Sequence, residues 1–210
     1  MAKFIRAAID LGKNYFQVHL ESEGGRSVSR KVKRSKMHEV YSQIEPCRVG
    51  MEACGSAHYW ARQLIAMGHE VVLIPPAYVK PYVKRGKNDV VDAAAICEAM
   101  SRPDMRFVPV KSADQQAVLM LHKTRELLVK QRTMAVNALR GHLAEFGIVA
   151  AKGIGRVDEL LELAKADAAL PPIAGAAVAC MAQHLEGLDL SIGTVDQEIA
   201  QAHRQNPISR

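Results

Sequence analysis

The stretch FIRAAIDLGKNYFQVHLESEGGRSVSRKV, which spans residues 4–32, decides the predicted fold. Residues 4–10 alternate loosely between apolar and polar side chains and end at a glycine turn, which is typical of a β-strand. Residues 15–20 and 26–32 have the same character, and a pair of glycines supplies the turn between them. Three strands this close together leave no room for crossover helices, so we predict a meander rather than a doubly wound parallel sheet.

Helix and strand patterns alternate after this meander. Ser35 is the expected N-cap of the first helix. The spacing of apolar residues predicts helices over residues 35–44, 56–67 and 88–100, and strands over 47–53 and 71–74. This order predicts an α/β fold with a mixed sheet and flanking helices, the plan of RNase H-like (RuvC-like) domains.

A second, helical part is expected after this domain. Between residues 112 and 146 proline is absent, and apolar side chains recur at helical spacing. A short helix over 156–166 and a final helix from about 175 to 204 follow, and the final helix is expected to pack antiparallel against the long one. We therefore divide the chain into an RNase H-like domain over residues 1–110 and a long basic helix with a helical coiled-coil region over 111–210.

Composition excludes several classes of protein. No apolar run approaches the ~18 residues that cross a bilayer, and the N-terminus lacks the pattern of a signal peptide. The four cysteines form no CxxC pair, which argues against a structural zinc site. A cytoplasmic protein without a membrane partner is expected.

The positive charge is concentrated in the first part of the chain. Residues 1–150 contain 23 Lys and Arg against 14 Asp and Glu, whereas residues 151–210 contain 5 against 8. A basic surface of this kind suits a phosphate-backbone partner, although many other proteins share it.

Four carboxylates are placed where they could meet. Asp10 ends the first predicted strand, and Glu52 ends the fourth. Asp89 and Asp92 lie three residues apart, on one face of a helix. If the first and fourth strands are neighbours, a helix across their ends would bring all four together. Such a cluster is costly without a cation, and its hard oxygen ligands suit Mg²⁺, with Mn²⁺ as a plausible substitute.

Each carboxylate alone also fits a structural role. Asp10 stands at a common type of strand-to-glycine turn, and Asp89 suits the positive end of a helix dipole. Glu45 is an alternative to Glu52. Asp92 lies on a largely apolar helix where an unpaired carboxylate would be expensive to bury, which favours a functional role.

Two basic segments accompany the acidic residues. Lys84, Arg85 and Lys87 directly precede Asp89 and could hold a phosphate backbone, or could equally form a solvated loop. The second segment is more typical of a solvated edge strand than of a specific site; it comprises Arg30, Lys31, Lys33, Arg34 and Lys36. The long helix adds a further predicted nucleic-acid-binding set, namely Arg125, Lys130, Arg132 and Arg140.

Three of these segments together resemble a known family. The segments AIDLGK (residues 8–13), GMEACG (50–55) and KRGKNDVVDA (84–93) resemble the DEDD-type insertion-sequence transposases, and the third resembles the pattern G-x-K-[TN]-D-x-x-D-A. KQR (130–132) and NALRG (137–141) look like the basic helix that follows the nuclease domain in that family.

The resemblance implies a metal-dependent DNA transposase guided by a structured bridge RNA and working as dimers that pair into tetramers. Asp10, Glu52, Asp89 and Asp92 would be its catalytic and metal-binding carboxylates. The family also implies a C-terminal domain with a nucleophilic serine, and no segment of this chain resembles it. The chain is therefore expected to supply the metal-binding half of a composite active site.

Two alternatives stay open. Residues 8–12 also resemble the first phosphate-binding strand of actin-like sugar kinases and exopolyphosphatases, but the second D-x-G loop of those proteins does not occur downstream. The chain could also be a non-catalytic nucleic-acid-binding module that uses the long helix. Because aromatic residues are few, backbone contacts rather than base stacking would then dominate.

Overall fold

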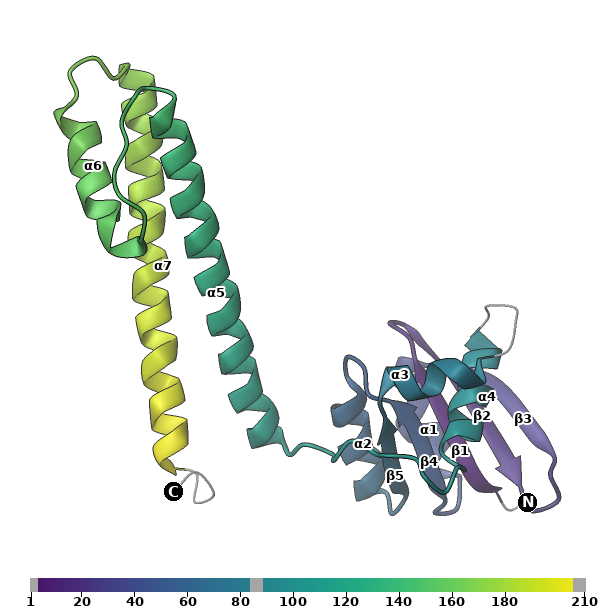
Figure 1. The fold of residues 1–210 in the computed structure, drawn as a ribbon. Helices are drawn as coiled ribbons and strands as arrows, with labels where there is room; N and C mark the ends of the chain where they lie inside the picture. Colours follow the sequence, from purple (N-terminus) through teal and green to yellow (C-terminus); the bar gives the residue numbers. More distant parts are fainter. Residues whose placement is uncertain (1–3, 84–88, 206–210) are drawn as a thin grey trace. The chain divides into compact units, whose positions relative to one another are not determined.

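The computed structural model describes residues 4–83 and 89–205, apart from the side chains of residues 89 and 90. The chain divides into two compact units (Figure 1), which we name the sheet unit, residues 1–113, and the helical unit, residues 114–210. None of the helices in the described ranges is both long enough and apolar enough to cross a bilayer.

The sheet unit is built on five strands in the order β3-β2-β1-β4-β5. The first three form the predicted antiparallel meander, and the last two continue the sheet in parallel: β1 (Phe4–Leu11), β2 (Tyr15–Ser22), β3 (Ser27–Lys33), β4 (Arg48–Glu52) and β5 (Glu70–Ile74). Gly12 makes the first turn possible, because a side chain there would collide with the carbonyl of Tyr15. The predicted mixed sheet with flanking helices is confirmed, and its order is consistent with an RNase H-like fold.

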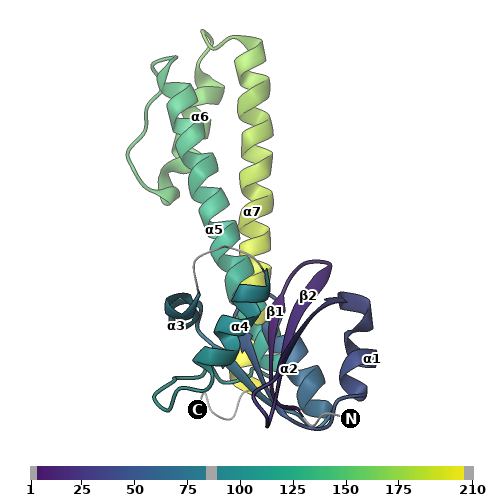
Figure 2. The same cartoon turned by 90° about the vertical axis from the view of Figure 1, so that its right-hand side faces the viewer.

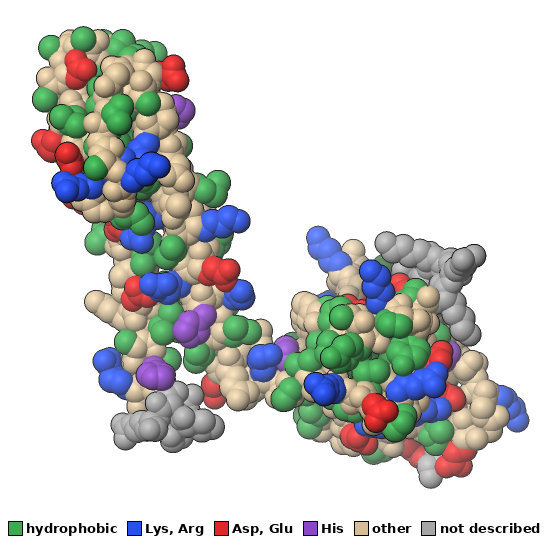
Figure 3. Space-filling model, in the orientation of Figure 1, with side chains coloured by type: hydrophobic (Ala, Val, Ile, Leu, Met, Phe, Trp, Pro, Cys, Tyr) green, Lys and Arg blue, Asp and Glu red, His purple; other side chains and the backbone are tan. Residues whose placement is uncertain are grey.

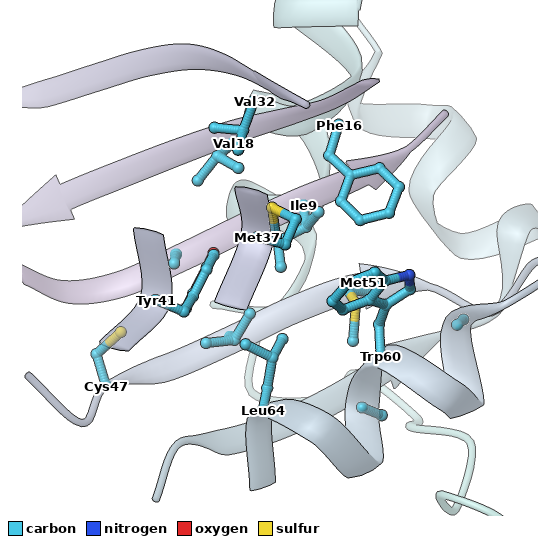
Figure 4. Close-up of a cluster of buried hydrophobic side chains, with 14 of the residues drawn as sticks. Ile9, Phe16, Val18, Val32, Met37, Tyr41, Cys47, Met51, Trp60 and Leu64 are labelled. Atoms are coloured by element: carbon cyan, nitrogen blue, oxygen red, sulfur yellow. The ribbon is translucent and has the colours of Figure 1, made fainter. Parts of the chain in front are cut away.

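One face of the sheet is covered by α1 (Met37–Ser42) and α2 (Ala57–Ala66). Figure 4 shows the resulting core, in which Ile9 and Met51 from the sheet lie close to Trp60 and Leu64 from α2. The rings of Phe16 and Trp60 meet edge to face, with their centroids 5.1 Å apart. Full burial of an aliphatic side chain such as Ile9 contributes about 1.5–3 kcal/mol, so this cluster fixes the sheet.

The opposite face is covered by α3 (Pro76–Val79) and α4 (Asp89–Ala99). Figure 2 shows α3 and α4 on one side of the sheet and α1 on the other. The sheet and α4 pack closely because the sheet residues that face α4 are small. Ala8 packs with Ile96 and Met100, and a Cβ atom at Gly50 would lie 2.6 Å from the sulfur of Met100.

One local prediction was wrong. Ser35 does not cap a helix, because Arg34–Lys36 form a 3₁₀ turn and α1 begins only at Met37. β5 ends at Ile74, before the pair Pro75-Pro76. Pro76 occupies the first turn of α3, where its missing N–H costs no hydrogen bond. A 3₁₀ turn, Lys80–Tyr82, follows α3.

The helical unit consists of α5 (Ala113–Ala144), α6 (Val157–Ala166) and α7 (Pro172–Gln205). Its core joins the second half of α5 to the first half of α7 and to α6, through residues that include Leu139, Leu160 and Leu185. α7 begins slightly earlier than the predicted residue 175. The predicted antiparallel pairing of α5 with α7 is visible in Figures 1 and 2 and is held by two ion pairs, Arg125–Asp196 and Arg132–Asp189.

Candidate functional site

Three carboxylates from three separate segments line one cavity of the sheet unit. Asp10, Glu52 and Asp92 share a pocket of about 470 Å³. Its other walls come from the segment after β5 and from α4: Pro76, Val79, Lys80, Val83 and Ile96. The structure thus brings three of the four predicted carboxylates to one cavity.

Strand register places the first two acids. β1 and β4 run parallel, with Ile9 opposite Met51. Asp10 and Glu52 are the next residues of the two strands, so they reach the same edge of the sheet side by side. Asp10 also lies on the α4 face, because side chains alternate along a strand and Ala8 packs against α4.

Helix α4 places the third acid. Asp92 and Ile96 are four residues apart, so they occupy the same helical face, and both line the cavity. Gly50 permits this approach, since a Cβ atom there would also lie 3.3 Å from Cγ2 of Ile96. The glycine two residues before Glu52 thus determines how close Asp92 can come.

The electrostatics of the cavity follow from the grouping of like charges. The pKa of Glu52 is raised, first by burial and then by the neighbouring Asp92 carboxylate. The pKa of the Cys54 thiol is raised as well, mainly by burial, with contributions from Glu52 and Asp10. A negative potential of this kind favours a bound cation.

The donor chemistry fits a hard divalent cation. Asp10, Glu52 and Asp92 offer carboxylate oxygens, which Mg²⁺ and Mn²⁺ prefer. Within the described ranges no three His, Cys, Asp or Glu side chains are gathered tightly enough to enclose an ion. Asp89 begins α4, but its side chain lies outside the described part, as do Lys84, Arg85 and Lys87 in their entirety.

Comparison with known proteins places the chain in a family. The sequence profile of a transposase family, labelled DEDD and IS110, matches residues 7–148. The chain belongs to this DEDD transposase family. A putative transposase of Sinorhizobium fredii is 47% identical over 209 residues, which is 99% of this chain and 54% of that protein.

Two further transposases are similar to this chain over most of its length. A probable family 20 transposase of Pseudomonas aeruginosa is 47% identical over 202 residues, 94% of this chain and 60% of its own length. The transposase for insertion sequence element IS1328 of Yersinia enterocolitica is 40% identical over 192 residues, 91% of this chain and 57% of its own length. The chain thus spans between 54% and 60% of the length of these relatives.

The predicted nucleic-acid-binding arginines of α5 have partners inside the helical unit. Arg125 pairs with Asp196, and Arg132 pairs with Asp189 at 2.6 Å. Arg140 donates hydrogen bonds to two backbone carbonyls in the segment that follows α5, those of Ala150 at 3.0 Å and Gly153 at 2.9 Å. Figure 3 shows Lys and Arg side chains interspersed with Asp and Glu along this unit. All three arginines therefore have partners within the helical unit, and nucleic-acid binding by them stays a prediction.

Lys130 is exposed, as is Arg125, but no ion pair between described residues involves Lys130. It lies near Glu126, whose pKa it helps to lower behind the larger effect of Lys123. Of the four α5 residues in the predicted set, Lys130 is the one best placed to meet a partner from solution.

Sequence reasoning missed part of the cavity wall. Val79, Lys80 and Val83 line it because α3 and the following turn fold back over the end of β5. The available signal was the second of two prolines, since proline is favoured in the first turn of a helix as well as after a strand. Lys80 adds the positive charge that a phosphate beside the carboxylates would require.

Proposed function

We propose that this chain is the metal-binding part of a DNA transposase, in which Asp10, Glu52, Asp89 and Asp92 together hold Mg²⁺ or Mn²⁺ in an RNase H-like domain. The observation that supports it is the shared cavity of three carboxylates from β1, β4 and α4. The label of the family, DEDD, has the same order of acids as these four positions.

The chain's own residues would divide the work at a phosphodiester. The carboxylates bind and orient, and Lys80 neutralises a phosphate oxygen at the cavity mouth. Val79, Val83 and Ile96 form an apolar wall that limits water. A bound divalent cation would add stabilisation of the charge on the attacking and leaving oxygens. A nucleophile is not assigned to this chain, in keeping with a composite active site completed by another domain.

The further features of this proposal rest on the family resemblance. They are insertion-sequence mobility, a bridge RNA guide, assembly into dimers and tetramers, and a cytoplasmic setting. A coiled coil formed by α5 and α7 has additional support, because their two ion pairs are spaced by seven residues on each helix, the heptad spacing of coiled coils.

Metal binding is the direct test of the site. Mn²⁺ is titrated into the wild-type chain and into Asp10→Asn, Asp92→Asn and the double variant, with bound ion followed by electron paramagnetic resonance. We expect each single variant to weaken binding and the double variant to abolish it. Asp104→Asn is the matched control, since Asp104 is exposed and lies in a different pocket. Equal binding by the wild type and the double variant would remove the assignment.

The guide is tested separately on a full-length relative. RNA that co-purifies with a full-length relative is sequenced, and a structured RNA from the flank of its own gene is expected. Recovery of unrelated cellular RNA alone would contradict the guided mechanism while leaving the metal site untouched.

A further inference from the structure

Strand register leads from the acidic cavity across the buried Gln17 to two lysines on the edge strand. Register pairs Asp10 with Gln17 on β2, and Gln17 with Lys31 on β3. Residues directly opposite one another in paired strands point to the same face. Lys31 therefore lies on the cavity face, two strands away from Asp10. Two strand spacings of ~4.8 Å separate the backbones of the two residues by about 10 Å.

The next position along the strands adds the second lysine. Tyr15 lies opposite Lys33, and the ammonium of Lys31 is 5.3 Å from the centroid of the Tyr15 ring. Both lysines are exposed, and 43% of Tyr15 is accessible to solvent. We name Tyr15, Lys31 and Lys33 the edge patch.

The other cations of this segment either point to the opposite face of the sheet or contact other side chains. Arg30 lies opposite Val18 and so points to the other face of the sheet. Arg34 is 5.3 Å from the Phe16 ring and 5.6 Å from the Trp60 ring, and Lys36 pairs with Glu39 at 2.7 Å. Among ion pairs between described residues, none involves the two edge-patch lysines.

Position on the sheet also favours an extended polyanion. β3 is the outermost strand of the five, and its sequence, SVSRKVK, contains no acidic residue. The ~10 Å from Asp10 to Lys31 corresponds to about three nucleotides at a rise of ~3.4 Å each. Because Gln17 between them is buried, the backbone would pass over the residues that cover Gln17. The ring of Tyr15 offers a stacking surface for a base beside two phosphate-binding ammonium groups.

We propose that the edge patch holds the DNA strand that is cut, a few nucleotides from the scissile phosphate. This inference rests on the proposed function, because the carboxylates define which strand enters the cavity. β3 is the exposed edge strand that the sequence predicted, and register places two of the five cations of residues 30–36 on the cavity face.

Binding measurements on the whole chain test the patch. Fluorescence anisotropy with a single-stranded DNA of about 20 nucleotides, and with RNA of the same sequence, is measured without divalent metal over a range of salt. Lys31→Gln/Lys33→Gln should weaken DNA binding about tenfold or more and reduce the salt slope by about 1.4, the value for two phosphate contacts to a single strand. Tyr15→Leu should weaken binding with little change in slope.

Lys36→Gln/Arg106→Gln is the matched control, since it removes two exposed charges outside the patch. Equal losses in this control and in the patch variant would overturn the proposal, as would unchanged DNA affinity in the patch variant. A loss confined to RNA would overturn the assignment to DNA. The Mn²⁺ titration of Asp10→Asn/Asp92→Asn fails or succeeds independently, so it tests the proposed function apart from the patch.

Discussion

Gly50 on β4 lies directly beneath Met100, so closely that an added Cβ atom would lie 2.6 Å from the methionine sulfur. This contact involves no carboxylate, yet it limits how closely α4 can approach the sheet. Asp92 belongs to the same helix, so the separation of Asp92 from Asp10 and Glu52 depends on a residue without a side chain.

Enlarging Gly50 should therefore disturb both stability and metal binding. Gly50→Ala forces Met100 and Ile96 to shift and should cost about 1–3 kcal/mol of unfolding free energy, with Gly50→Val costing more. Urea unfolding measures the first effect, and Mn²⁺ affinity of the folded variant measures the second. Gly55→Ala is the control, because nothing lies within 4 Å of its added Cβ. Equal stability of the Gly50 and Gly55 variants would contradict this role.

Glu52 should make stability fall as pH rises. Burial and Asp92 raise its pKa in the folded state above the usual 4.5, so the ionised form is disfavoured by folding. Stability is fully present below the unfolded pKa and is lost as pH rises through the higher folded value. Glu52→Gln should thus gain Tm relative to the wild type between about pH 4 and pH 7. If the Tm advantage of Glu52→Gln over the wild type instead became smaller as pH rises over this range, the prediction would be contradicted.

Arg140 should behave as a structural residue. Arg140→Ala removes two hydrogen bonds to backbone carbonyls and should destabilise the helical unit by about 1.5–3 kcal/mol. Arg140→Lys keeps the charge but lacks the planar fork, and should recover only part of the loss. Thermal unfolding followed by circular dichroism checks both. If Arg140→Lys matched the wild type, charge alone would be the requirement.

Exchanging the members of an ion pair separates packing from nucleic-acid contact. Arg132→Asp and Asp189→Arg should each lower stability by up to about 1 kcal/mol, and the double exchange should restore it. The double exchange keeps net charge but moves the cation from α5 to α7. Because Arg132 is engaged with Asp189, we expect DNA affinity and salt slope to remain at wild-type values. A loss of DNA affinity in the double exchange would show that Arg132 contacts the nucleic acid.

The sheet and the meeting of its acids were predictable because both depend on local signals. Short turns between the first strands dictated the meander, and Asp10 and Glu52 stand at strand ends that parallel pairing brings to one edge. Asp92 stood out as a carboxylate on an apolar helix.

Other features depend on contacts that are distant in sequence. The ion-pair partners of Arg125 and Arg132 lie 71 and 57 residues away on α7, so the sequence alone could not reveal them. Lys80 could not be placed because two prolines signal a break without saying that a new helix begins. The edge patch could be identified only from the register of β2 against β3, which composition and periodicity do not supply.

The two ion pairs between α5 and α7 have a consequence for how such a helix pair can change in length. Arg125 and Arg132 are seven residues apart, and so are Asp196 and Asp189. An insertion in one helix alone would break the match, whereas seven residues added to both would preserve it and lengthen the hairpin by about 10 Å. The length of this hairpin should therefore vary among relatives by seven residues, or two helical turns, in both helices together.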